Sequence, residues 1–180
     1  MSISLKREFV VFAALLAVGV VLRLVPHPAN VTPVFAAAIF GGAVLSNRSA
    51  FLLPIFTLVL SDLFLGWYTP GVLASVYGSA LVAVYLGTRL RNIQSRGEVS
   101  VSAIVSSLFF FVVSNFAVWL FTPLYPQTVT GLVAAYVAAL PFLRNELVGT
   151  LVYALTFFEL AKLWTLYRPH NKFFVSCLTG

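Results

Sequence analysis

The sequence predicts an all-α protein: a polytopic membrane helical bundle with six transmembrane helices. Of its 180 residues, 61% are hydrophobic and only 9% are charged, whereas a water-soluble domain carries about 25% charged residues. The mean hydropathy is +1.00, and long apolar runs alternate with short polar gaps. The charged surface that water requires is missing, so we infer that lipid covers much of this protein.

Each predicted span is an apolar run near the roughly 20 residues that a helix needs to cross the hydrocarbon core. The first follows Lys6 and Arg7, as in a signal peptide, but residues 25–28 offer no small-x-small cleavage site, so we expect a retained helix. The second is short and has Pro33 in its first turn, and Pro54 should kink the third. The six spans are residues 9–25, 31–45, 50–67, 70–87, 99–121 and 145–163.

The segment between the last two spans, residues 131–143, is apolar but would extend only about 20 Å as a helix. Pro141 lies near its end, and the polar residues 144–146 follow at once. We predict a short interfacial or re-entrant helix that covers the outer mouth of the bundle. The sequence shows no internal repeat or long linker, so residues 1–180 are expected to form one integral membrane domain.

Basic residues predict that both termini lie in the cytoplasm, because Lys and Arg concentrate in cytoplasmic loops. This topology leaves Arg23 and Arg144 outside and puts the nine others inside. Those nine are Lys6, Arg7, Arg48, Arg89, Arg91, Arg96, Lys162, Arg168 and Lys172. A seventh span at 131–143 would move the last three outside and weaken the bias. Six spans fit the charges better.

Several function classes are excluded or disfavoured. The net charge of +6 lies in the gaps between apolar runs rather than along one element, which argues against nucleic-acid binding. The single cysteine, Cys177, excludes an internal disulfide framework and a multi-cysteine metal site. No GxxxxGK[ST], HExxH or GxSxG motif is present, so we predict no catalytic activity, no metal and no cofactor. Glu159 and Lys162, three residues apart, are expected to form a local ion pair.

Polar residues that lipid should exclude concentrate in the outer half of the predicted bundle. A charge at mid-helix costs about 2.5–3.5 kcal/mol on insertion scales, so it usually faces a cavity or a partner. The clustering predicts a polar cavity open to the exterior. In it Arg23 would pair with a ligand carboxylate or phosphate, Asp62 and Glu146 would accept hydrogen bonds, and aromatic rings would stack on the ligand. The predicted substrate-binding residues are Arg23, His27, Asn30, Asp62, Asn115, Trp119, Asn145 and Glu146.

Each of these residues also has a structural explanation. Arg23 or Arg144 would pair with Asp62 or Glu146, Asn115 would bond a neighbouring backbone group, and the aromatic residues would form an interfacial belt. A loop histidine without a second one nearby more often caps a helix than binds a metal. If all these side chains were paired in this way, no binding site would remain. The presence of a cavity distinguishes the two interpretations.

Two other function classes remain open. An intramembrane enzyme would use His27 with Asp62 or Glu146 as acid and base, with the imidazole within about 3 Å of a carboxylate. A non-catalytic membrane scaffold would have no cavity, and its Asp62 and Asn115 would be fully paired inside the protein. The spatial relation of these side chains decides between the classes.

Small residues spaced four apart predict close helix contacts, because packing drives helix association in lipid. One interpretation is packing inside this bundle. Another is that the face of the first span carrying Ala13 and Ala17 docks a partner subunit. The pairs are Ala13/Ala17, Ala37/Gly41 and Ala38/Gly42.

Five short motifs resemble those of a family of small uncharacterised bacterial integral membrane proteins. The match covers most of the chain, and the family looks like the substrate-binding S components of energy-coupling factor transporters, which are six-helix proteins of about this size. The motifs are Arg23-Leu24-x-Pro26-His27-Pro28-x-Asn30-x-Thr32-Pro33, Leu60-Ser61-Asp62, Phe110-Phe111-x-x-Ser114-Asn115-Phe116-x-Val118-Trp119, Tyr125-Pro126-x-Thr128-x-x-Gly131-Leu132 and Pro141-Phe142-x-x-Asn145.

The resemblance implies a receptor for a vitamin-like nutrient in the bacterial cytoplasmic (inner) membrane, with its site at the outer face. It also implies a partner transmembrane subunit, docked on Ala13 and Ala17, and two cytoplasmic ATPases. Some solitary S-component-like proteins handle cobalamin, and one such group relies on a cysteine near the outer site. Here Cys177 lies on the predicted cytoplasmic side, so that mechanism does not carry over, and the substrate stays open.

Overall fold

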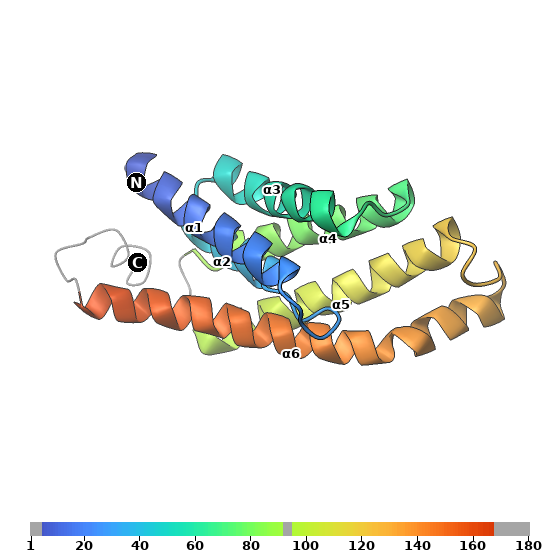
Figure 1. Cartoon of the computed structure of the whole chain (residues 1–180). Helices are drawn as coiled ribbons and strands as arrows, with labels where there is room; N and C mark the ends of the chain where they lie inside the picture. The colour runs from blue at the N-terminus through green and yellow to red at the C-terminus, as the bar shows by residue number, and fades with distance from the viewer. Residues whose placement is uncertain (1–4, 92–94, 168–180) are drawn as a thin grey trace.

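The computed structural model describes residues 5–91 and 95–167, and every regular element within these ranges is an α-helix (Figure 1). This confirms the all-α prediction. Cys177, Arg168 and Lys172 lie outside the described residues. The helices are α1 (Leu5–Leu24), α2 (Val34–Val44), α3 (Asn47–Leu65), α4 (Pro70–Thr88), α5 (Arg96–Phe121) and α6 (Val129–Tyr167).

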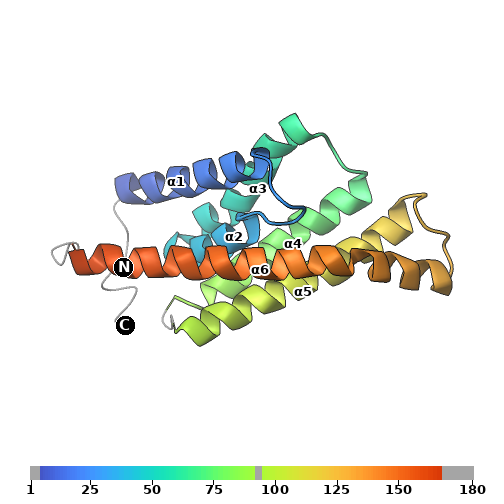
Figure 2. The same cartoon turned by 60° about the horizontal axis from the view of Figure 1, so that its bottom comes forward.

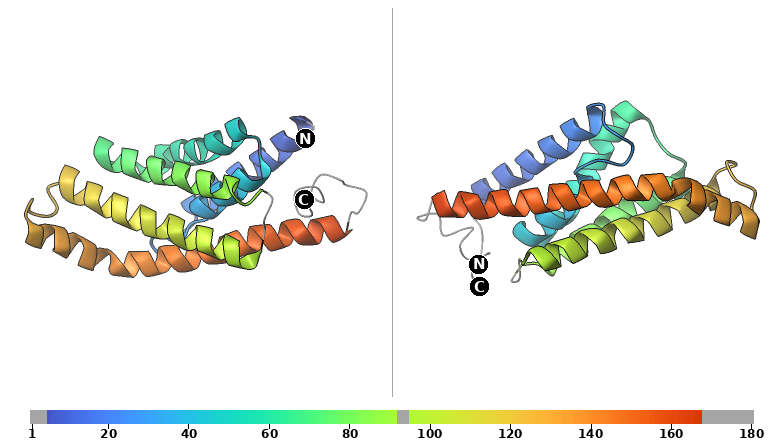
Figure 3. Two further views of the ribbon diagram at one scale, coloured as in Figure 1. Left: turned by 180° about the vertical axis from the view of Figure 1, so that it is seen from behind. Right: turned by 90° about the horizontal axis from the view of Figure 1, so that it is seen from below.

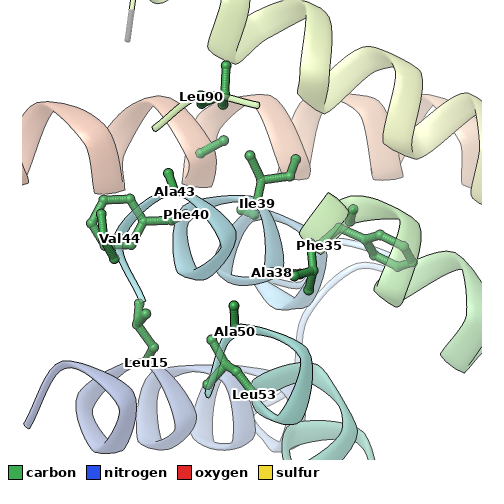
Figure 4. Close-up of a cluster of buried hydrophobic side chains, with 14 of the residues drawn as sticks. Leu15, Phe35, Ala38, Ile39, Phe40, Ala43, Val44, Ala50, Leu53 and Leu90 are labelled. Atoms are coloured by element: carbon green, nitrogen blue, oxygen red, sulfur yellow. The ribbon is translucent and has the colours of Figure 1, made fainter. Parts of the chain in front are cut away.

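The short helix α2 lies at the centre of the bundle and contacts each of the other five helices. Figure 2 shows α1 and α3 on one side of it and α5 and α6 on the other, and Figure 3 shows α4 beside α5. All eleven residues of α2 are buried. Ile39 and Phe40 belong to an apolar cluster, part of which is shown in Figure 4. The whole cluster draws side chains from all six helices. A helix that is hydrophobic on every face needs such surroundings.

Glycines allow α2 and α4 to approach closely. A Cβ added at Gly42 would collide with the carbonyl oxygen of Val84, and one added at Gly87 would collide with that of Ile39. Gly41 lies against the side chain of Leu53 on α3. The small-residue pairs of α2 are therefore used for packing inside this bundle, as helices in lipid require small residues at close crossings.

Four helices, α3, α4, α5 and α6, are long and apolar enough to cross a membrane, and they indicate a membrane protein. Helix α1 has 20 residues but carries Glu8 in its first turn and Arg23 in its last. Helix α2 has eleven residues, so it extends only about 16 Å against a hydrocarbon core of about 30 Å. The loop at residues 25–33 precedes it.

The prediction of a separate interfacial or re-entrant helix at residues 131–143 is wrong. These residues form the first part of α6, which runs unbroken for 39 residues and contains Pro141. A proline inside a helix removes one hydrogen bond and kinks the helix by a clash with the preceding turn, whereas ending the helix in apolar surroundings would leave several costly unpaired backbone groups. The helix therefore continues and bends along its length (Figure 1). The span predicted at 145–163 is the second part of this longer helix.

Charged residues stabilise the end of the bundle where α2 ends and α5 begins. Arg91 donates from Nε to the carbonyl of Gly42 over 3.0 Å and from Nη2 to that of Leu45 over 2.9 Å, which satisfies carbonyl groups at the end of α2. Glu159 lies 3.5 Å from Lys162, which confirms the predicted local ion pair, and it also accepts from Arg96 over 2.8 Å. The charged side chains at this end cap and connect helices, and none of those that the structure describes here is buried.

Candidate functional site

All six helices contribute to a partly open cavity of about 490 Å³ at the end of the bundle where α1 ends and α4 begins. Most of its wall is apolar, and a few polar side chains converge on it. This composition is typical of small-molecule sites. The polar lining residues are Arg23, His27, Asn30, Thr32, Tyr68, Ser114 and Glu146.

A smaller cavity of about 250 Å³ adjoins the first one, because the two share part of their walls. It lies between α5, α6 and the loop that joins α1 to α2, and it adds Asn115, Phe111 and Phe142 to the lining. The shared residues are Asn30, Phe110, Ser114 and Glu146. Together the cavities form one candidate site with an aromatic part and a polar part.

The loop at residues 25–33 forms a wall of the site and packs against the middle of α6 (Figure 2). Asn145 Nδ2 donates to the carbonyl of Ala29 over 3.0 Å, and Gly149 lets Val31 approach the helix closely. Asn30 has a φ of +64°, the only positive φ of a non-glycine within the described residues. Asparagine tolerates this left-handed conformation better than most residues. The backbone is therefore shaped to place Asn30 in both cavities.

His27 lies in the same loop and closes the end of α1. Its Nδ1 is 2.9 Å from the carbonyl oxygen of Pro28, and its Nε2 is 3.2 Å from that of Arg23. The last carbonyls of a helix lack partners within the helix, so the capping interpretation of His27 holds. Among residues 5–91 and 95–167, no three His, Cys, Asp or Glu side chains gather in a metal-binding group.

Arg23 and Asp62 form a buried ion pair beside the larger cavity. Nη1 of Arg23 lies 2.6 Å from Oδ1 of Asp62 and also donates to Ser61, while Nη2 donates to the Tyr68 hydroxyl over 2.9 Å. The other carboxylate oxygen, Oδ2, accepts from the Tyr77 hydroxyl over 2.9 Å. Asp62 is fully buried and lines neither cavity. Each oxygen of Asp62 therefore has a partner, and a ligand anion would have to share Arg23 with Asp62.

Glu146 is the second buried carboxylate at this end, and its surroundings differ. It is 3% exposed and lines both cavities. Its Oε1 accepts from the Thr150 hydroxyl over 2.8 Å, one turn along the same helix. The described residues supply no ion pair to it. Glu146 is thus the one predicted acidic residue that the structure places at the cavity surface.

The other predicted residues have mainly structural contacts. Asn115 lines the smaller cavity, but its Nδ2 donates to the carbonyl of Phe111 in its own helix over 2.8 Å. Trp119 lines neither of these cavities, and its indole donates to the carbonyl of Pro126 over 3.0 Å, which ties α5 to the following loop. Five of the eight predicted residues line the cavities, namely Arg23, His27, Asn30, Asn115 and Glu146.

The two alanines predicted to dock a partner lie differently on α1. Ala13 is half-buried and Ala17 is exposed. The contact of α1 with α3 instead uses Gly19, where a Cβ would lie 2.8 Å from a methyl carbon of Thr57. The surface at Ala17 is therefore left outside this internal contact.

Some site residues were not predicted from the sequence. Thr150 lies four residues after Glu146 on a helix, a spacing that brings side chains together, so a local signal was present. Tyr77 lies on a different helix from Asp62, and only the packing of α3 against α4 reveals their contact. Phe110 and Phe142 occur in the motifs that carry the resemblance, but nothing local indicates that their rings line a cavity.

A family model matches residues 3–171, which is nearly the whole chain. The protein belongs to that family of unknown function, DUF6580. This agrees with the uncharacterised family that the motifs resemble, whereas the family description makes no mention of energy-coupling factor transporters. Searches among curated proteins and among solved structures gave no match. The function of this DUF6580 member therefore has to be argued from its site.

Proposed function

We propose that this DUF6580 protein is a membrane-embedded receptor that binds a small, vitamin-like nutrient in the two adjoining cavities and presents it for uptake. The observation that carries the proposal is the enclosure of these cavities by all six helices, with polar side chains from α1, the loop, α5 and α6. A volume of about 490 Å³ for the larger one falls within the roughly 300–1,000 Å³ of small-molecule sites.

In this proposal the chain crosses the bacterial cytoplasmic membrane six times, with both termini inside. Helix α2 and the loop at residues 25–33 together make the second crossing, with the loop in the outer half. A non-helical segment is tolerated at membrane depth where protein surrounds it or where it lines a cavity. Asn30 and Thr32 line the larger cavity, so the loop meets this condition.

Energy for uptake would come from partner subunits, since the chain contains no GxxxxGK[ST] motif. The likeness to S components suggests a transmembrane partner and two ATPases. The exposed position of Ala17 on α1 supports this face as the docking surface. Ala17→Leu should reduce co-purification with such a partner and leave solute binding unchanged.

The direct test is thermal unfolding of the purified protein with a panel of vitamins that includes cobalamin. A ligand should raise the melting temperature of the wild type. Ser114→Leu, which fills the wall shared by both cavities, should abolish the rise. The matched control is Val112→Leu on the exposed face of the same helix, which should retain it. No rise with any compound, from protein shown to be folded, contradicts the proposal.

The two rival functions have less support. An enzyme using His27 as a base would need a carboxylate near its imidazole, but both nitrogens lie near the carbonyls of Pro28 and Arg23. A scaffold accounts for the complete pairing of Asp62, yet it predicts no cavity and gives no reason for Glu146 to line one.

A further inference from the structure

Glu146 has one carboxylate oxygen that the protein does not use. Oε1 accepts from Thr150, and Oε2 accepts no hydrogen bond from the described residues. The side chain is 3% exposed, and it lines both cavities where they adjoin. Oε2 is not among the fully enclosed side-chain atoms that lack a partner. This acceptor is therefore open toward the cavities.

No Lys or Arg side chain among the described residues forms an ion pair with Glu146. Arg23 lines the larger cavity, but its guanidinium is bound to Asp62 and Tyr68. Arg144 is exposed, and it precedes Glu146 by two residues on α6, a spacing that puts side chains on different faces of a helix. A buried carboxylate without a cation is costly in free energy. A ligand that brings a positive charge would remove this cost.

The walls around Glu146 suit the rest of such a ligand. Phe110, Phe111 and Phe142 line the smaller cavity together with Glu146, and the rings of Phe35 and Phe110 lie 4.8 Å apart. Aromatic faces attract organic cations and pack against flat apolar groups. The amide of Asn30 borders the same space.

We propose that the ligand is an organic cation, with an ammonium or amidinium group on an aromatic or other apolar body, and that its charged group binds Oε2 of Glu146. This inference rests on the receptor function proposed above and narrows its substrate class. It differs from the expectation of an anionic ligand on Arg23, since the structure pairs Arg23 with Asp62. The charge-assisted hydrogen bond to Glu146 would supply both affinity and orientation.

The test uses three probes of nearly the same shape and different charge: benzamidine as the cation, benzamide as the neutral analogue and benzoate as the anion. Binding to the full-length protein in nanodiscs is measured by calorimetry at neutral pH. We expect the wild type to bind benzamidine at least about tenfold more tightly than benzamide, because a charge-assisted hydrogen bond is roughly twice as strong as a neutral one. Benzoate should bind most weakly.

Glu146→Gln should reduce the preference for benzamidine to about twofold or less, since the amide keeps the shape and removes the charge. The matched control is Glu159→Gln, on the same helix but paired with Arg96 outside both cavities, which should keep the full preference. If Glu146→Gln does not fold, Glu146→Asp replaces it and should keep the preference for the cation while weakening its affinity, because the charge remains and the side chain is shorter.

Failure of this inference is distinguishable from failure of the receptor function. Equal or tighter binding of benzamide or benzoate, retention of the preference in Glu146→Gln, or no binding of any probe overturns the cation proposal. The receptor function is judged separately by the vitamin panel and the Ser114→Leu variant. If a panel compound without a positive charge binds in the cavities, the receptor function stands and the cation proposal fails.

Discussion

The two buried carboxylates at one end of the bundle have opposite surroundings. Asp62 receives Arg23 on one oxygen and Tyr77 on the other, and it lies behind the cavity wall. Glu146 receives only Thr150 from its own helix and lines both cavities. A paired charge that no ligand can reach holds helices together, whereas an unpaired charge at a cavity surface is available for binding. From the sequence the two carboxylates look equivalent, but their contacts in the structure differ.

The largest expected effect comes from removing the cation of the paired carboxylate. Arg23→Met should lower the free energy of unfolding by about 3–5 kcal/mol, because it leaves Asp62 buried without its counter-charge. The double variant Arg23→Met/Asp62→Asn should recover most of this loss. Both are measured by denaturant unfolding in detergent micelles. If the double variant is no more stable than the single one, the ion pair is not what stabilises this region.

The hydrogen bond on the other oxygen of Asp62 should have the next largest effect. Tyr77→Phe should cost about 1.5–3 kcal/mol of unfolding free energy, the range for hydrogen bonds to charged groups. Tyr68→Phe removes a bond to Arg23 instead, and Tyr68 is 40% exposed, so water can replace its hydroxyl. Thermal unfolding of the two variants should therefore show the smaller loss for Tyr68→Phe, and the reverse order would weaken the distinction between the two carboxylates.

The larger cavity, which Glu146 lines, depends on the placement of α2, because Phe35 of this helix also lines it. Gly42→Ala puts a Cβ against the backbone of α4, so it should cost about 1–3 kcal/mol of stability, as overpacking does, and it should weaken solute binding. Gly78→Ala, on α4, meets no atom within 4 Å and should change stability by less than about 1 kcal/mol. Unfolding and binding assays on both variants check this, and equal effects would contradict it.

The smallest expected effect distinguishes Glu146 most sharply from Asp62. In the absence of ligand, Glu146→Gln should leave the free energy of unfolding unchanged or raise it by about 1 kcal/mol, because it removes an uncompensated buried charge. Asp62→Asn should lower it, since Arg23 then loses its counter-charge. Unfolding measured side by side for the two variants gives the sign of each change in the free energy of unfolding. A large loss for Glu146→Gln would mean that Glu146 is also a structural residue.

The helices were predictable because an apolar run is a local signal. The predicted span at 70–87 matches α4 (Pro70–Thr88), and the one at 99–121 lies within α5 (Arg96–Phe121). The continuity of α6 was not predictable from the same signal. Pro141 ends a helix in some surroundings and only bends it in others, and the apolar environment of the folded protein favours continuation.

The location of the candidate cavities was partly predictable, since costly polar residues gather at one depth, and five of the eight predicted residues line these cavities. Which of these residues pair with one another was not predictable. Arg23 and Asp62 are 39 residues apart, and the sequence equally allowed Arg23 to pair with Glu146. Trp119 and Asn145 turned out to bond loop carbonyls, which no pattern of residue types distinguishes from binding a ligand.

By itself, the sequence determined that this protein is a bundle of apolar helices in which the polar residues that lipid should exclude gather toward one end, because hydrophobicity and helix length depend only on neighbouring residues. Only the tertiary structure decided which carboxylate is paired and which faces a cavity. That choice depends on the packing of α1 and α4 against α3, which brings Arg23 and Tyr77 to Asp62, and on the position of α6, where Glu146 receives neither of them. A charge is compensated or left open by groups distant along the chain, and their meeting is a property of the packed bundle.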